Sequence, residues 1–150
     1  MKTGPPRDAV ADVSRHCTLF HLRKASRSIT QIYDATLAPV GLKGTQFTLL
    51  SGIALSEEAT VQQLAERLVT DRTTLTRNLA LLVKAGFVRI GVGTDRRSRL
   101  VTLTPKGREI LAEALPLWAE AQAHVVSSLG TKRWRGLLDH LADVVSIPRR

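Results

Sequence analysis

Residues 64–88 read LAERLVTDRTTLTRNLALLVKAGFV, and the fold of the chain depends on this stretch. Just before it, Thr60 and Gln63 form a Thr-x-x-Gln capping box, which predicts the start of a short helix. Asp71 is the expected cap of a longer helix, and Gly86 the left-handed residue that ends it. The apolar side chains expected on the buried face of this longer helix are Leu75, Leu79, Leu82 and Val83. A short helix, a tight turn and a longer helix together indicate a helix-turn-helix.

The hydrophobic period changes from helical to alternating after Gly86. Residues 88–92 and 99–103 each alternate between apolar and other side chains, which predicts two strands. The sequence Gly-Thr-Asp-Arg-Arg-Ser at 93–98 is typical of a loop, so the two strands should form a hairpin with a basic tip. A hairpin that directly follows a helix-turn-helix is the layout of a winged helix-turn-helix.

Helical periodicity is also found on both sides of this core. Residues 14–37 carry apolar side chains at steps of three and four, and Thr45 can cap a further helix. Pro105 begins a long helix in which Pro116 predicts a kink, and Gly130 separates it from a last helix. We therefore expect a mainly α fold with a small β-hairpin wing, in which N- and C-terminal dimerisation helices flank the winged helix-turn-helix core.

The charge of the chain narrows the class of partner. The chain has 150 residues, a net charge of +9, a pI near 10.8 and 43% hydrophobic residues, which fits one folded basic domain. Between Glu66 and Arg99 there are eight basic residues and three acidic ones, so +5 of the net charge lies on the helix-turn-helix and hairpin. The sequence contains neither the roughly 18 consecutive apolar residues of a membrane helix nor a secretory signal. We expect a cytoplasmic protein with an anionic partner and no membrane contact.

The residue types on the longer helix and in the hairpin match those that read DNA. Arginine bonds guanine, asparagine pairs with adenine and threonine contacts the thymine methyl group. The candidates on the helix are Arg72, Thr73, Thr74, Thr76, Arg77 and Asn78. The candidates in the hairpin, which can follow phosphates or enter a minor groove, are Asp95, Arg96, Arg97 and Arg99. A solvated helix face and an ordinary charged turn are the structural alternatives. The order of the two elements and the concentrated charge favour double-stranded DNA.

Three segments together resemble the MarR family of transcriptional regulators: TQFTLL at 45–50, residues 64–88, and DRRSRLVTLTPKG at 95–107. The resemblance covers about residues 14–147. It implies an obligate homodimer whose dimerisation layer is built from the helices at both ends of the chain. It also matches Asp95 and Arg97 with the Asp and Arg of the family's wing, where the Arg enters the minor groove. Finally, it implies that a small molecule, often an aromatic or phenolic acid, lowers the affinity for DNA.

The resulting domain organisation is a flexible arm over 1–12 and a single MarR-like domain over 13–150. Within that domain, we expect the DNA-binding core at about 43–104. The dimerisation helices should lie at about 14–38 and 105–147.

The expected effector site combines aromatic and basic side chains. Its candidates are Phe20, His21, Arg27, Phe47 and Trp118, because the basic groups can hold an anion beside the aromatic rings. A solvated or salt-bridged helix face is the structural alternative for the basic residues.

The single cysteine, Cys17, has two interpretations. Part of the family senses peroxide through a cysteine on the first helix, which makes Cys17 a candidate redox residue. A buried, inert thiol is favoured, since Cys17 lies about half a turn away from that reactive position and the chain has no partner cysteine. His16 and His21 are five residues apart and do not share a helical face, so we expect no metal site, and no cofactor either.

These features predict a sequence-specific DNA-binding transcriptional regulator that acts as a repressor. It would bind a pseudo-palindromic operator as a homodimer and be released by a small-molecule or oxidant signal. The alternative is a sequence-indifferent structural nucleic-acid-binding protein. An enzyme is disfavoured, because the sequence has no Gly-rich phosphate loop, nucleophile elbow or paired catalytic carboxylates.

Overall fold

The computed structural model describes residues 4–56, 58–93 and 98–148. Two helices begin the chain, α1 (Arg7–His16) and α2 (Thr18–Leu37), followed by a 3-10 turn, η1 (Ala38–Val40). The central elements are α3 (Gly44–Ala54), β1 (Ala59–Thr60), α4 (Val61–Arg67), α5 (Arg72–Lys84), β2 (Val88–Val92) and β3 (Arg99–Leu103). Two helices end it, α6 (Pro105–Leu129) and α7 (Thr131–Ser146). The predicted mainly α fold with a small β-hairpin wing is confirmed.

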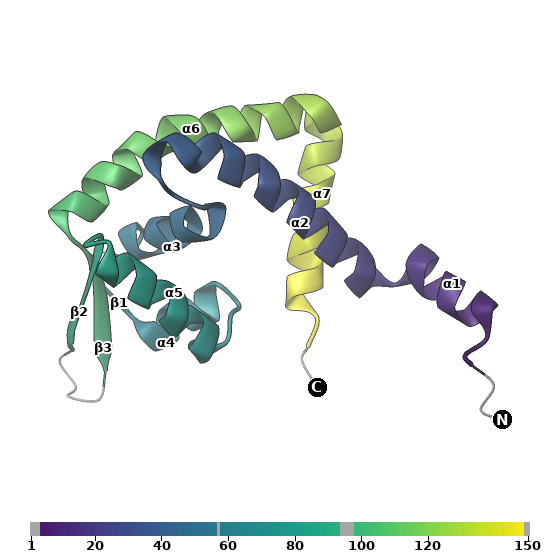
Figure 1. Ribbon diagram of the computed structural model, residues 1–150, viewed down its shortest axis with the longest axis horizontal. Helices are drawn as coiled ribbons and strands as arrows, with labels where there is room; N and C mark the ends of the chain where they lie inside the picture. The colour runs from purple at the N-terminus through teal and green to yellow at the C-terminus, as the bar shows by residue number, and fades with distance from the viewer. Residues whose placement is uncertain (1–3, 57, 94–97, 149–150) are drawn as a thin grey trace.

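The elements form two layers (Figure 1). Helix α2 packs against α6, and α3 contacts both of them. Below this pair lie α3, α4, α5 and the sheet, whereas α1 and α7 extend away from the central elements. The winged helix-turn-helix thus lies beneath α2 and α6.

The hydrophobic core joins the helix-turn-helix to the sheet and to α6. The side chains buried most completely come from the end of α2 and from α3, α4, α5 and β3: Leu37, Leu50, Ile53, Leu64, Leu75, Leu79, Leu82 and Val101. The predicted buried face of α5 is confirmed for its three leucines. It is wrong for Val83, which is 41% exposed. Val83 follows Leu82 by about 100° around the helix, which carries it beyond the buried stripe.

Local hydrogen bonds fix the helix starts within the helix-turn-helix. The capping box is confirmed, since Gln63 N donates to Thr60 Oγ1 at 3.1 Å and Thr60 N donates to Gln63 Oε1 at 2.9 Å. Asp71 caps α5 as predicted, because its Oδ1 accepts from Thr74 N at 2.8 Å. Gly86 ends α5 with a φ of +78°.

Helix α3 begins differently from the prediction, which made Thr45 its cap. Gly44 is already helical, and its N donates to Asp34 Oδ1, on α2, at 2.7 Å. Lys43 N donates to Gln46 Oε1 at 2.9 Å. One amide of this helix end, Gly44 N, is therefore satisfied by a carboxylate from another helix, which a local sequence pattern does not reveal.

The predicted hairpin is confirmed as the antiparallel pair β2 and β3, with Val88 opposite Leu103 and Val92 opposite Arg99. Strand β1 pairs with the other edge of β3, so the sheet has the order β1-β3-β2. The sequence did not predict β1, because two residues are too few to show alternation. The hairpin tip, with Asp95, Arg96 and Arg97, lies outside the described residues.

The N-terminal region differs most from the prediction. Residues 7–12, expected to be part of a flexible arm, belong to α1, and the helix expected over 14–37 is interrupted at Cys17. Cys17 has extended backbone angles, while its N donates to the Val13 carbonyl at 3.0 Å and its carbonyl accepts from His21 N at 3.1 Å. The interruption leaves these backbone groups paired, and neither proline nor glycine marks it in the sequence.

Helix α6 is continuous through Pro116 and curves along its length (Figure 1). Its N-terminus is attached to the turn between α5 and β2. The Thr104 hydroxyl donates to the Gly86 carbonyl at 2.6 Å, and Lys106 Nζ donates to the Ala85 carbonyl at 3.0 Å. Gly107 packs so closely that a Cβ there would lie 1.9 Å from the Phe87 carbonyl oxygen. This junction couples the end of α5 to α6.

Candidate nucleic-acid interface and adjoining pocket

The predicted DNA-reading side chains of α5 lie on its outer face. Arg72, Thr73, Thr74, Thr76 and Arg77 are exposed, and Asn78 is half-buried. The opposite face of α5 carries the buried leucines. The amphipathic pattern thus places a row of polar and cationic groups in solvent on a helix anchored to the core.

Hydrogen bonds order the first turn of this face. The pKa of Asp71 is held below its ordinary value by hydrogen bonds from the Thr74 side chain and backbone. The Thr76 hydroxyl donates to the Arg72 carbonyl at 2.7 Å. Asp71 therefore takes up at least the Thr74 amide at this end of the helix.

The turn between α4 and α5 contains a strained residue. Val69 has a φ of +51°, a conformation that a β-branched side chain rarely adopts. The turn is closed by the Thr70 N–H, which donates to the Ala65 carbonyl at 3.0 Å. This backbone geometry sets the orientation of α5 relative to α4.

The wing follows α5 directly in the chain. Arg99 is exposed at the start of β3, and the hairpin beneath the tip is closed by Gly93 N, which donates to the Ser98 carbonyl at 3.0 Å. Asp95, Arg96 and Arg97 stay predictions, because they lie outside the described residues.

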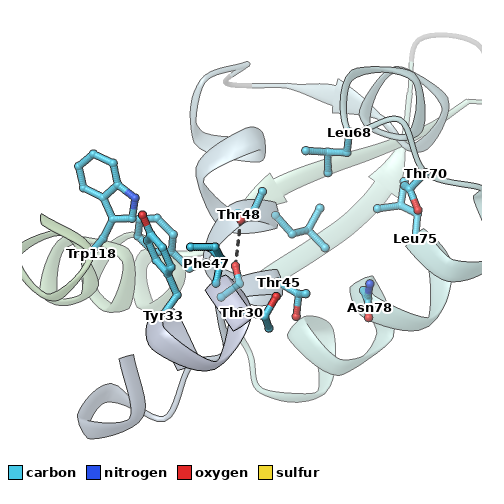
Figure 2. A pocket seen from close by; sticks show the side chains of 13 residues that line it. Thr30, Tyr33, Thr45, Phe47, Thr48, Leu68, Thr70, Leu75, Asn78 and Trp118 are labelled. Carbon is cyan, nitrogen blue, oxygen red and sulfur yellow. Dashed lines mark hydrogen bonds between the residues drawn. The ribbon is translucent and has the colours of Figure 1, made fainter. Parts of the chain in front are cut away.

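A pocket of about 490 Å³ lies on the other side of α5 (Figure 2). Its walls come from α2, α3, the α4–α5 turn, α5 and α6: Ile29, Thr30, Tyr33, Gly44, Thr45, Phe47, Thr48, Leu49, Leu68, Thr70, Leu75, Asn78 and Trp118. Two of the predicted effector residues meet here, since the rings of Phe47 and Trp118 stack with centroids 6.2 Å apart and an angle of 17° between their planes.

The other three predicted effector residues do not line this pocket. Phe20 and His21 make an edge-to-face contact with ring centroids 5.6 Å apart, and His21 Nε2 lies 3.1 Å from the Arg15 carbonyl oxygen. Arg27 is exposed on α2. These three residues therefore lie apart from Phe47 and Trp118, and their role in an effector site stays a prediction.

Sequence reasoning missed the residues of α2 that do line the pocket, Ile29, Thr30 and Tyr33. Ile29 and Tyr33 are four residues apart, so the helical period was the available signal. The Tyr33 hydroxyl donates to Gln122 Oε1, on α6, at 2.6 Å, and burial raises the pKa of Tyr33. This bond fixes the Tyr33 ring against α6.

Cys17 is half-buried at the interruption between α1 and α2, and its thiol is free. Within the described part of the chain, no three His, Cys, Asp or Glu side chains are grouped as they would be around a metal ion. Of the helices in the described ranges, none has both the length and the apolar character needed to cross a membrane.

The outer helices expose apolar side chains. Neither α1 nor α7 contains a buried residue. Exposed apolar residues on these helices and at the start of α2 include Val10, Val13, Leu19, Phe20, Leu137, Leu138, Leu141 and Val145. These faces have no partner within the described residues of the single chain.

Comparisons with known proteins agree with this architecture. A model of the MarR family matches residues 40–98. The M. tuberculosis transcriptional regulator MosR, solved in complex with DNA, is 39% identical, with a TM-score of 0.74 over 88% of this chain and 100% of that one. The transcriptional regulator SarZ of Staphylococcus saprophyticus is 33% identical over 95 residues, and the match spans 63% of this chain and 64% of SarZ.

The fold extends to a more distant relative. A mutant of E. coli MarR, solved with operator DNA, is 24% identical and has a TM-score of 0.79 over 97% of this chain and 100% of that one. At this identity the likeness concerns the fold alone. The family-model match and the likeness to MosR show that the chain belongs to the MarR family, and the E. coli MarR structure shares its winged helix-turn-helix fold.

Proposed function

We propose that this protein is a transcriptional regulator that binds a pseudo-palindromic DNA operator as a homodimer and represses transcription. The observation that carries the proposal is the row of exposed polar side chains on α5, a helix that the Asp71 cap fixes and the hairpin wing follows directly: Arg72, Thr73, Thr74, Thr76 and Arg77. A helix of this kind fits the major groove, where Arg, Thr and Asn distinguish base pairs. MosR, which is 39% identical, was solved in complex with DNA.

The homodimer is supported by the unpartnered apolar faces of α1 and α7. Leu137 and Leu141 lie one turn apart and so form an apolar stripe on one face of α7. Their side chains are nevertheless 41% and 37% exposed. Burying these faces against a second copy would remove apolar area from water, and two-fold symmetry is the commonest way for two copies to do so. Two recognition helices would then meet half-sites about one turn of DNA apart.

The signal that releases the DNA is proposed to be a small molecule, because the pocket is lined by Leu75, on the buried face of α5, and by the half-buried Asn78, which is itself a predicted DNA-reading residue. An oxidant is the second candidate and would act through Cys17. If Cys17→Ser abolished release by peroxide, the oxidant would be the signal. If the variant and the parent protein responded alike, Cys17 would have no sensing role.

Specificity is the test of the main proposal. The upstream intergenic DNA of the gene should bind roughly a thousandfold more tightly than random DNA of equal length, measured by fluorescence anisotropy. Arg77→Ala should change the preferred sequence, whereas Arg135→Ala, on α7, should not. Equal affinity for both DNAs would instead support the alternative, a sequence-indifferent nucleic-acid-binding protein.

A further inference from the structure

The pocket beside α5 has the dimensions of a small-molecule site and two distinct ends. Its volume of about 490 Å³ lies within the usual range for ligand pockets. Figure 2 shows Tyr33, Phe47 and Trp118 at one end, and Thr70, Leu75 and Asn78 at the other, with Thr30, Thr45 and Thr48 between them. Aromatic rings therefore face one part of a ligand, while neutral hydrogen-bonding groups face the rest.

None of the described residues that line the pocket has a charged side chain. Among the residues that the structure describes, the polar members of the wall are threonines, Tyr33 and Asn78. Burial raises the pKa of Tyr33, which means that this environment disfavours a negative charge on the Tyr33 hydroxyl. A ligand carboxylate would have to leave water without gaining a cation.

Basic residues close to the pocket are directed elsewhere. His21 and Arg27 do not line it, as described above. Arg67 lines an adjoining pocket of about 390 Å³ that shares four wall residues with the first: Phe47, Thr48, Leu68 and Trp118. The Arg67 guanidinium donates to the Gly52 carbonyl at 3.2 Å, near the C-terminal end of α3, and to the Ser56 hydroxyl.

The other feature that attracts anions is the N-terminus of α3, where the first amide is already taken. Gly44 and Thr45 line the pocket, and free amides at a helix start ordinarily favour a negative group. Here Asp34 accepts the hydrogen bond from Gly44 N at 2.7 Å. The carboxylate of Asp34 takes the place that a ligand anion would need and repels a second negative charge.

From this arrangement we infer that the pocket takes an uncharged planar aromatic molecule with hydrogen-bonding substituents, and discriminates against aromatic carboxylates. The ring lies against Tyr33, Phe47 and Trp118, and the substituent reaches the threonines or Asn78. The inference rests on the proposed function for its regulatory meaning, but the preference of the pocket can be measured without DNA.

A neutral and an anionic probe of the same shape test this directly. In the full chain carrying Trp134→Phe, Trp118 is the single tryptophan, and quenching of its fluorescence reports binding. At pH 7.5, 2-naphthamide should bind about tenfold more tightly than 2-naphthoate, or better. Equal or tighter binding of the naphthoate overturns the inference, and so does the absence of binding by both probes.

Three variants locate the preference in this pocket. Thr30→Lys should reverse it in favour of the naphthoate, while Gln31→Lys, an exposed neighbour outside the pocket, should leave it unchanged. Asp34→Asn keeps an oxygen for Gly44 N but removes the charge, so the naphthoate alone should gain, by about threefold. A preference that none of the pocket variants alters would place the binding elsewhere and overturn the inference.

DNA binding by the same preparations separates this inference from the proposed function. If the protein does not bind DNA specifically but still prefers the naphthamide, the regulatory proposal is contradicted and the proposed ligand class is supported. If DNA binding is specific but the naphthoate binds better, only the ligand class is wrong.

Discussion

The central winged helix-turn-helix and the two outer helices differ in how their apolar residues are used. Helix α5 buries Leu75, Leu79 and Leu82 to within 2% of full burial, inside a core that also includes α3, α4, the sheet and α6. Helix α7 is longer and also amphipathic, yet none of its residues is buried. An amphipathic helix therefore has its apolar face buried in the core in one region and exposed to solvent in the other.

The difference teaches which part of the molecule is stable by itself. The central part satisfies its helix starts and apolar face within one chain, so its stability should not depend on protein concentration. The outer helices expose apolar area that only another molecule can cover, so their order should depend on association. The following changes test this contrast, beginning with the largest expected effect.

Gly107→Ala should damage the central part most. A Cβ at this position would lie 1.9 Å from the carbonyl oxygen of Phe87, and this backbone has no room to move away without displacing the α5–β2 turn. We expect a loss of about 3 kcal/mol or more in the free energy of unfolding, measured by urea denaturation. The matched control is Gly136→Ala in α7, where a Cβ meets nothing within 4 Å. It should stabilise by about 0.5–1 kcal/mol, and equal losses in both variants would contradict the contrast.

Leu79→Ala and Leu141→Asp should separate folding from association. Leu79 is 1% exposed, so its truncation should cost about 3 kcal/mol at every protein concentration. Leu141 is 37% exposed on α7, and a charge there should shift the protein toward the monomer in light scattering while the urea midpoint of the central part changes little.

Ser146→Asp provides the control for the added charge, since it lies about 140° around α7 from Leu141. It should leave the mass unchanged. If Leu141→Asp also left the mass unchanged, the open face of α7 would not mediate association.

Val69→Gly should stabilise the protein by about 1 kcal/mol. The φ of +51° strains a β-branched residue by about 1–3 kcal/mol, which exceeds the entropic disadvantage of glycine, about 0.5–1 kcal/mol. Val83→Gly, at an exposed helical position of α5, should instead destabilise by about 0.5 kcal/mol. Opposite signs in thermal denaturation support the strain in the turn, and equal signs contradict it.

The central part was predictable from sequence because its signals are local. The Thr60–Gln63 capping box, the Asp71 cap and Gly86 all act within a few residues, and the structure confirms each of them. The exceptions depend on distant contacts. Asp34 caps α3 from another helix, and the strand β1 forms only through its pairing with β3.

The pocket was predictable only in part for a similar reason. Phe47 and Trp118 are aromatic residues on apolar faces, and the structure brings them together. Phe20, His21 and Arg27 were chosen for their chemistry on the assumption that the ligand is an anion, yet the pocket lies further along α2, at Thr30 and Tyr33. Which turn of a long helix faces a cavity is decided by the packing of α2 on α6, and no local pattern records it.

The smallest expected effect concerns the cap of α5. Hydrogen bonds from Thr74 lower the pKa of Asp71 in the folded protein below its ordinary value of 3.8. A carboxyl whose pKa is lowered by folding stabilises the protein above its unfolded pKa, and that contribution is lost as the pH falls through the lower, folded value. Wild-type protein should therefore lose stability below about pH 4 more steeply than Asp71→Asn, which keeps an acceptor for Thr74 N but cannot titrate. The two slopes are compared in urea titrations between pH 2.5 and 5. Parallel slopes for the wild type and Asp71→Asn would mean that the cap holds α5 through hydrogen-bond geometry alone, without a contribution from its charge.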